Sequence, residues 1–208
     1  MPEVEYSTRM HLTPEDIWEF VKDMNNWAPM LTGYQKHEIL SETDSIWTLK
    51  GDVGVLSRMV QLKAHVVEWN GPAKVAFTLT GLNEQVDGGG ELVMGTVAAD
   101  AAGALVPAAK LKKGLWRRFV DAVFRKLFRM MNGGGPARRE LTAVAGRPTS
   151  QLTFTLRMEA GGPTGPLVNA MLAPALLPAA EDLANKIAAH LEKVHGIAAE
   201  AGSTRKAA

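Results

Sequence analysis

The chain contains no cysteine, and this absence excludes several kinds of chemistry. None of its 208 residues can form a disulfide, act as a thiolate nucleophile or supply a cysteine ligand to a metal. The lack of cysteine also fits a reducing compartment such as the cytoplasm. With 46% hydrophobic residues, the chain is expected to fold around one sizeable apolar core, with appendages rather than a second full domain.

Long apolar runs are absent as well. No stretch reaches the roughly 18 consecutive apolar residues that indicate a transmembrane helix. The N-terminal sequence MPEVEYSTRM has neither the basic start nor the apolar run of a secretory signal. We therefore expect a cytoplasmic protein that is soluble or at most peripheral on a membrane.

The usual signatures of enzymes are also missing. The sequence has no G-x-S-x-G elbow, no P-loop and no dinucleotide-binding fingerprint. Its histidines have no metal-ligand spacing of the H-E-x-x-H kind, and they are His11, His37, His65, His190 and His195. These absences predict a non-catalytic protein without a metal site.

Two ionisable residues within a predicted strand are the candidates for an interior acid or base. His65 and Glu68 both fall between Arg58 and Trp69. Side chains alternate between the two faces of a strand, so His65 is expected on the face opposite the apolar residues. Of these two residues, only Glu68 could then face a cavity.

The alternation of apolar residues predicts a series of antiparallel strands. A first strand is expected at Glu3 to Leu12, and Thr13-Pro14-Glu15-Asp16 then supplies an N-cap, a first-turn proline and acids for a short helix. Further strands are predicted from the pattern of apolar residues between turn signals, at 34–41, 45–50, 58–69, 74–82, 91–97, 139–145 and 151–159.

A helical pattern follows the last strand, from Gly162 to Val194. Pro174 and Pro178 lie inside this segment, and each removes a backbone hydrogen bond. We therefore expect the helix to be kinked or broken there. The tail 197–208 is small and polar, and is expected to be disordered.

The segment KLKKGLWRRFVDAVFRKLFRMM, residues 110–131, combines eight basic residues with one acid, Asp121. Since the whole chain has 23 basic and 22 acidic residues, the remainder is acidic. On a helical wheel the apolar side chains gather on one arc and the charged ones on the other. Such a helix is suited to lie on an anionic membrane surface. The residues predicted to bind the membrane are Leu115, Trp116, Arg117, Arg118, Phe119, Val123, Phe124, Arg125, Lys126, Leu127, Phe128 and Arg129.

The same amphipathic pattern is compatible with three other roles. Its apolar face could pack on the protein's own core or on a partner protein, and a calmodulin-like target role has similar requirements. Nucleic acid is disfavoured, because the acidic remainder of the chain provides no second basic face.

Several turn and backbone motifs resemble those of the family of G-type carbon monoxide dehydrogenase subunits, within the START and polyketide-cyclase-like superfamily. They are Thr13-Pro14-Glu15-Asp16-Ile17-Trp18, Gly51-Asp52-Val53-Gly54, Gly81 with Gly88-Gly89-Gly90, and Gly161-Gly162 followed by Gly165-Pro166-Leu167. The resemblance covers about Glu3 to Gly95 and Gln151 to Leu191. It departs at Ala98 to Arg138, where the common pattern has a short hairpin.

The resemblance implies an α+β helix-grip fold, in which a curved antiparallel β-sheet wraps around a long C-terminal α-helix. Here an amphipathic helix is inserted into that fold. The expected organisation is a first part of the helix-grip domain at 1–97, the inserted basic helix and hinge at 98–138, the last strands and C-terminal helix at 139–196, and a tail at 197–208.

The fold also implies an apolar cavity between sheet and helix. The alternation of side chains along each strand indicates which residues would line it. The alternative for any one of these residues is a role in a packed core. The predicted ligand-binding residues are Trp27, Trp47, Val60, Leu62, Val75, Phe77, Leu79, Leu92, Met94, Phe154, Leu156, Met171, Leu172, Leu176 and Leu183.

The function that these expectations favour is carriage of a lipid-like ligand. We hypothesise a respiratory quinone, with no covalently bound cofactor. The resemblance implies a cytoplasmic molybdenum carbon monoxide dehydrogenase as partner, recruited to the inner face of the cell membrane. Two alternatives remain open: a ligand-free recruitment or assembly adaptor for the dehydrogenase, and a cyclase-like or hydratase-like enzyme on a small aromatic substrate.

Overall fold

The computed structural model describes residues 2–53, 56–97 and 148–197. In chain order the elements are β1 (Glu3–Met10), α1 (Pro14–Val21), α2 (Met24–Trp27), the 3-10 helix η1 (Ala28–Met30), β2 (Tyr34–Ile39), β3 (Asp44–Val53), β4 (Leu56–Asn70), β5 (Lys74–Gly81), β6 (Val86–Thr96), β7 (Ser150–Ala160) and α4 (Gly165–Val194). The predicted inserted helix at 98–138 and the strand at 139–145 lie outside the described residues.

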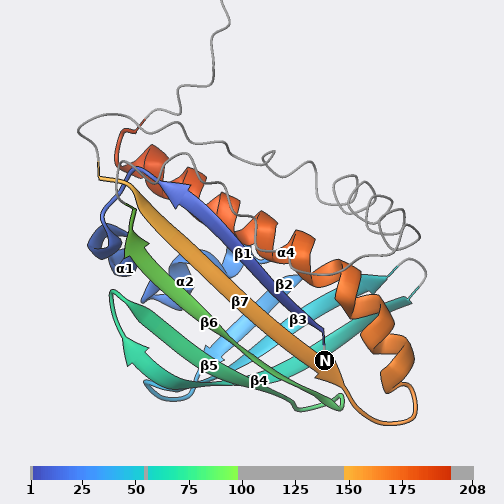
Figure 1. Ribbon diagram of the computed structural model, residues 1–208. Helices are drawn as coiled ribbons and strands as arrows, with labels where there is room; N and C mark the ends of the chain where they lie inside the picture. Colours follow the sequence, from blue (N-terminus) through green and yellow to red (C-terminus); the bar gives the residue numbers. More distant parts are fainter. Residues whose placement is uncertain (1, 54–55, 98–147, 198–208) are drawn as a thin grey trace, which may run out of the picture.

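The strands form one antiparallel seven-stranded sheet in the order β1-β7-β6-β5-β4-β3-β2. Figure 1 shows the sheet curving, with α4 lying alongside β1 and β7 and the short helices at one end. The first and last strands of the chain are therefore neighbours, and both pack against α4. This arrangement confirms the predicted α+β helix-grip fold.

The N-terminal helix α1 begins as the sequence predicts. The backbone N–H of Asp16 donates to the Thr13 hydroxyl at 3.2 Å, and the backbone N–H of Thr13 donates to the Asp16 carboxylate at 3.3 Å. This reciprocal capping box satisfies two backbone donors that a helix N-terminus otherwise leaves unpaired. The helix buries Ile17 and Val21, which join the core beneath the C-terminal half of α4.

One expectation about the elements is wrong, and a second holds only in part. Strand β6 begins at Val86 and includes Gly88, Gly89 and Gly90, which the sequence pattern assigns to a connection. The three glycines pair with β5 on one side and with β7 on the other. Since a glycine has a complete backbone donor and acceptor, the two flanking strands hold the run in the sheet despite its low strand propensity.

The second difference concerns α4, which was expected to be kinked or broken: it is not broken, and it continues through Pro174 and Pro178 as one helix, although Figure 1 shows that its axis bends. Each proline removes only one backbone donor. Flanking residues offset this loss by packing: Leu176 and Ala180 are buried against Val4 of β1. Tertiary packing thus overrides the local helix-breaking signal.

Hydrogen bonds fasten the start of α4 to the end of β7. The side-chain amide of Asn169 donates to the carbonyl of Ala160 at 3.0 Å and accepts from its N–H at 2.7 Å. Gly162 makes the turn between the two elements with a φ of 72°, a conformation that glycine adopts without strain. The turn folds the helix back over the sheet.

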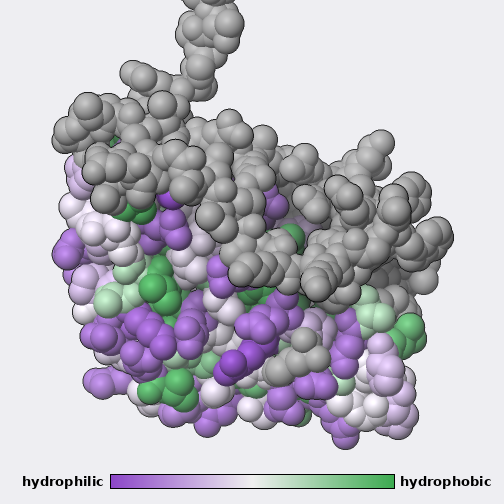
Figure 2. All heavy atoms as spheres, in the orientation of Figure 1, coloured by the Kyte–Doolittle hydropathy of each residue, from purple (hydrophilic) through white to green (hydrophobic). Residues whose placement is uncertain are grey.

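The face displayed in Figure 2 is mixed in character, with hydrophilic residues surrounding separate hydrophobic spots. Among the described residues, several large apolar side chains are exposed, including Val67, Trp69 and Val93. No helix in the described part of the chain is long and apolar enough to cross a membrane.

Candidate functional site

The register of the sheet identifies which side chains face α4, and we call this side the inner face. Directly paired residues of neighbouring antiparallel strands point to the same side. Val4, Leu156, Gly90, Phe77 and Val66 form one such row across β1, β7, β6, β5 and β4. Because Val4 packs on Leu176 and Ala180 of α4, this row lies on the helix side.

All the strand residues predicted to line a cavity lie on the inner face. They come from five strands, and the register places them together: Trp47, Val60, Leu62, Val75, Phe77, Leu79, Leu92, Met94, Phe154 and Leu156. Trp27 joins them from the end of α2, where its ring stacks on Trp47 with centroids 5.4 Å apart. Ligand contact by these residues stays a prediction, but their common orientation is established.

The inner face is packed unevenly. One core cluster, around Met10, Ile17, Leu152 and Leu191, fills the end near α1. A second, around Val4, Leu176 and Ala180, lies under the middle of α4. Outside both clusters, the inner-face residues Val60, Val66, Phe77 and Leu79 of β4 and β5 are only half-buried.

The position of α4 explains this difference. The helix makes its strand contacts chiefly with β1 and β7, at one edge of the sheet order. The inner-face residues of β4 and β5 lie two or three strands further along that order. Apolar side chains that keep contact with solvent on a concave sheet are the usual lining of a small-molecule site.

The helix residues predicted to roof the site differ in their roles. Leu176 and Leu183 are buried, one in each core cluster, and are therefore part of the packed core. Leu172 is half-buried. The side chain of Met171 lies outside the described part of the structure.

An aromatic stack occupies the inner face of β2 and β3. His37 lies parallel to Trp47, with ring centroids 5.0 Å apart, and Trp47 stacks in turn on Trp27. The Tyr34 hydroxyl and the His37 Nδ1 are 2.9 Å apart, within hydrogen-bonding distance. The Trp47 indole N–H donates to the hydroxyl of Ser45 at 2.9 Å. These contacts hold the rings in one orientation at the edge of the apolar wall.

Glu68 does not lie on the inner face, contrary to the prediction. A β-bulge between Val66 and Glu68 shifts the register, so Glu68 pairs with Ala76 on the outer face. There Lys74 forms ion pairs with Glu68 at 3.0 Å and Glu91 at 3.4 Å. Hydrogen bonds to these two carboxylates raise the pKa of Lys74 above its ordinary value. An extra residue in a strand reverses the parity of all that follows.

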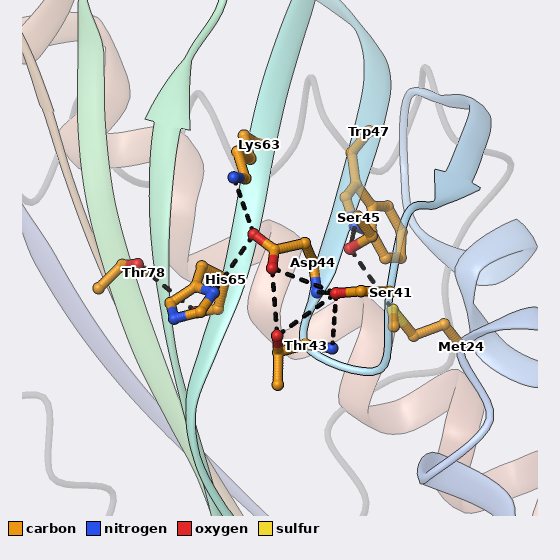
Figure 3. A network of polar contacts seen from close by, with 9 residues as sticks. All are labelled: Met24, Ser41, Thr43, Asp44, Ser45, Trp47, Lys63, His65 and Thr78. Atoms are coloured by element: carbon orange, nitrogen blue, oxygen red, sulfur yellow. Dashed lines mark hydrogen bonds and ion pairs between the residues drawn. The ribbon is translucent and has the colours of Figure 1, made fainter.

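His65 faces outward, as predicted, and takes part in a network centred on Asp44. Figure 3 shows this network, with Lys63 2.8 Å and His65 3.3 Å from the Asp44 carboxylate. The hydrogen bond from Lys63, with further ones from Thr43 and Ser41, lowers the pKa of Asp44 from 3.8 to about 2. The network stabilises the turn between β2 and β3 and is separate from the inner face.

The sequence reasoning overlooked polar residues that the fold brings to the helix–sheet interface. Tyr6 of β1 donates a hydrogen bond to the side-chain oxygen of Asn185 on α4, at 3.2 Å. On the same helix Asp182 accepts hydrogen bonds from Lys186 at 2.6 Å and from Thr32 at 2.9 Å. Strand parity could have placed Tyr6 beside Val4, but nothing in an alanine-rich helix indicates which polar residue meets it.

Within the described residues, no group of three or more acidic or histidine side chains is placed to bind a metal. His190 and His195 are exposed near the end of α4. His11 is buried beside Thr149, with 3.3 Å between the His11 Nδ1 and the threonine hydroxyl.

Comparison with known proteins shows the class to which this fold belongs. A family model described only as "-like:-like" matches residues 1–133. The match covers well over half of the chain, so the chain belongs to that family. No curated protein matches.

Solved structures with a similar fold are known. A START superfamily protein from Mycobacterium smegmatis matches with a TM-score of 0.52 and 12% identity over 93% of this chain and 99% of that one. The Zhui aromatase/cyclase from Streptomyces sp. R1128 matches with a TM-score of 0.51 and 15% identity over 92% of this chain and 93% of that one. A conserved protein from Geobacillus kaustophilus matches with a TM-score of 0.55 and 15% identity over 93% of this chain and 96% of that one. The chain thus has the START-like helix-grip fold.

Proposed function

We propose that this protein is a non-catalytic carrier of an uncharged, lipid-like ligand, held between the inner face of the sheet and α4. One observation carries the proposal: apolar inner-face residues of β4 and β5 are half-buried, while α4 covers β1 and β7. Packed cores rarely leave such side chains without cover. A ligand placed there would complete the burial.

The ligand we propose is an isoprenoid respiratory quinone. Burying about 500 Å² of an isoprenoid tail at about 25 cal/mol per Å² would contribute on the order of 12 kcal/mol before the costs of ordering and association. Apolar contact could therefore hold the tail without a charged group. The flat quinone ring would suit the stacked aromatic rings of Trp27 and Trp47.

We further propose that the 110–131 segment docks the protein on the inner face of the cell membrane. This part rests on the charge and apolar pattern of the sequence, since the segment lies outside the described residues. By resemblance to the family of G-type carbon monoxide dehydrogenase subunits, the proposed partner is a cytoplasmic molybdenum carbon monoxide dehydrogenase. The carrier would connect that enzyme with the membrane quinone pool.

Mass spectrometry of an organic extract tests the carrier proposal. The protein is purified from its native host without detergent, beside a Phe77→Trp, Leu156→Trp variant. Both positions pair with Gly90 on the inner face, so larger rings there fill the proposed site. Val93→Trp is the matched control, because Val93 is exposed on the outer face.

A stoichiometric quinone or long-chain lipid in the wild type and in the control, but not in the double variant, would support the carrier. An extract without ligand from all three proteins would contradict it. That result would favour the adaptor, which needs no ligand to recruit the dehydrogenase.

A cyclase-like activity is the second candidate, and the Tyr34–His37 pair favours it. These two titratable groups lie 2.9 Å apart on the inner face, where a general acid or base would have to lie. Turnover of a small aromatic polyketide-type substrate that disappears in His37→Ala would support an enzyme. Unchanged turnover in that variant would exclude this pair as the acid–base group.

A further inference from the structure

Asn185 is a polar residue inside an otherwise apolar layer. Its side chain is 1% exposed, between the buried residues Ala184 and Ala188 of α4. Its Oδ1 accepts the hydrogen bond from Tyr6, whereas its Nδ2 is buried without a hydrogen-bond partner. A buried amide donor without an acceptor is unfavourable, and native proteins seldom leave one so.

The position of this amide relates it to the ligand wall. Tyr6 pairs with Phe154 of β7, and Phe154 pairs with Leu92 of β6. Phe154 also stacks on Phe77, with ring centroids 6.5 Å apart. The Tyr6–Asn185 pair therefore lies where the apolar wall reaches α4. Tyr6 and Phe154 are half-buried, so both rings at this junction keep some contact with solvent.

The charges around the amide indicate what kind of acceptor it could bind. One turn before it and one residue after it on α4, Asp182 and Lys186 form an ion pair with 2.6 Å between Nζ and Oδ2. Lys186 also donates to the carbonyl of Met30 at 3.2 Å. These two charges balance each other. A ligand carboxylate would thus be buried among apolar side chains without a compensating cation, at high cost, whereas an uncharged carbonyl would not.

We infer that Asn185 binds a carbonyl oxygen of the ligand, through a hydrogen bond donated by Nδ2. Tyr6 is a positioning residue: by donating to Oδ1 it determines which end of the amide is turned toward the ligand. The ligand class is then an uncharged apolar molecule with a ring carbonyl, such as a quinone, rather than a hydrocarbon or a fatty acid. This inference rests on the proposed carrier function and adds its polar contact.

Two probes of the same shape isolate the carbonyl. The ligands are 2-methyl-1,4-naphthoquinone and 2-methylnaphthalene, each carrying the same isoprenoid chain at the neighbouring ring carbon, so that they share ring skeleton and tail and differ in the two carbonyls. Calorimetric titration of the wild type and of each variant with both ligands gives, for each protein, the ratio of the two dissociation constants. In Asn185→Leu the preference for the quinone should fall about tenfold, the value of one hydrogen bond of typical strength. Tyr6→Phe should show a smaller fall.

Ser7→Ala is the control, because Ser7 lies on the outer face of β1 and its hydroxyl is 2.9 Å from that of Thr153. Its ratio should equal that of the wild type. Infrared spectroscopy provides a readout that a structural role would not change: the carbonyl stretch of bound quinone should lie at higher frequency in Asn185→Leu than in the wild type. Asn185→Ala, which suits a helix, replaces the leucine variant if that one does not fold.

The outcomes separate the two proposals. If both probes bind but the ratio is the same in wild type and Asn185→Leu, the inference is overturned and Nδ2 meets only a buried water. If neither probe binds to the wild type, the carrier function fails and the inference fails with it.

Discussion

Phe77 of β5 and Phe154 of β7 stack on each other across the strand that separates them. Their ring centroids are 6.5 Å apart and the rings are inclined by 25°. The residue of β6 that pairs with Phe77 is Gly90, and a Cβ built there would lie 2.8 Å from the Phe77 ring. The missing side chain is therefore what lets two aromatic rings meet above a central strand.

The role of Gly90 predicts the effect of adding one methyl group. Gly90→Ala places a Cβ against the carbonyl oxygen of Thr155, which is part of the backbone and cannot move aside easily. We expect a loss of about 1–3 kcal/mol in the free energy of unfolding, as for other overpacked sites, measured by urea denaturation. Gly95→Ala, where a Cβ would meet nothing within 4 Å, is the control. Equal stability of the two variants would contradict the account.

The capping box of α1 predicts a second stability change. Thr13→Ala removes the hydroxyl that accepts the Asp16 N–H, and loss of an N-cap of this type costs about 1 kcal/mol. The same hydroxyl donates to the Asp16 carboxylate at 2.7 Å and lowers the pKa of that group. In the variant the pKa of Asp16 should rise toward its ordinary value, as followed by NMR titration. An unchanged pKa would mean that another group determines it.

The Asp44 network predicts sensitivity to acid. The pKa of Asp44 is about 2 in the folded protein, below the ordinary 3.8. As the pH falls, the Asp44 carboxylate is therefore protonated first in the unfolded chain. The stabilisation from Asp44 is thus complete above about pH 4 and is lost between about pH 4 and 2. Asp44→Asn should be less stable than the wild type at neutral pH, and the difference should disappear near pH 2. A difference in unfolding free energy that is constant over this range would contradict the prediction.

The basic segment predicts binding to anionic membranes. Replacement of Trp116, Phe119 and Phe124 by Ser should abolish sedimentation with anionic liposomes and leave the thermal unfolding of the sheet domain unchanged, because the apolar face drives insertion. Charge reversal at Arg117, Arg118 and Arg125 should make the remaining binding much less sensitive to salt. Cosedimentation of the serine variant at the wild-type level would reject the docking role.

The sequence predicted the inner face well because strand parity is a local property. Leu152, Phe154 and Leu156 alternate with polar residues, and the structure places all three toward α4. The same rule failed for Glu68, since it assumes an uninterrupted strand. The bulge after Val66 arises from the pairing of β4 with β5, and this pairing has no marker in the local sequence.

What the sequence determined by itself was the set of elements and the side of each strand that is apolar, because periodicity and capping depend on residues a few positions apart. The continuity of α4 through two prolines was decided by its packing on β1 and β7. So was the meeting of Tyr6 with Asn185, which are 179 positions apart in the chain. Such contacts depend on how the elements are brought together in space, and only the tertiary structure specifies that.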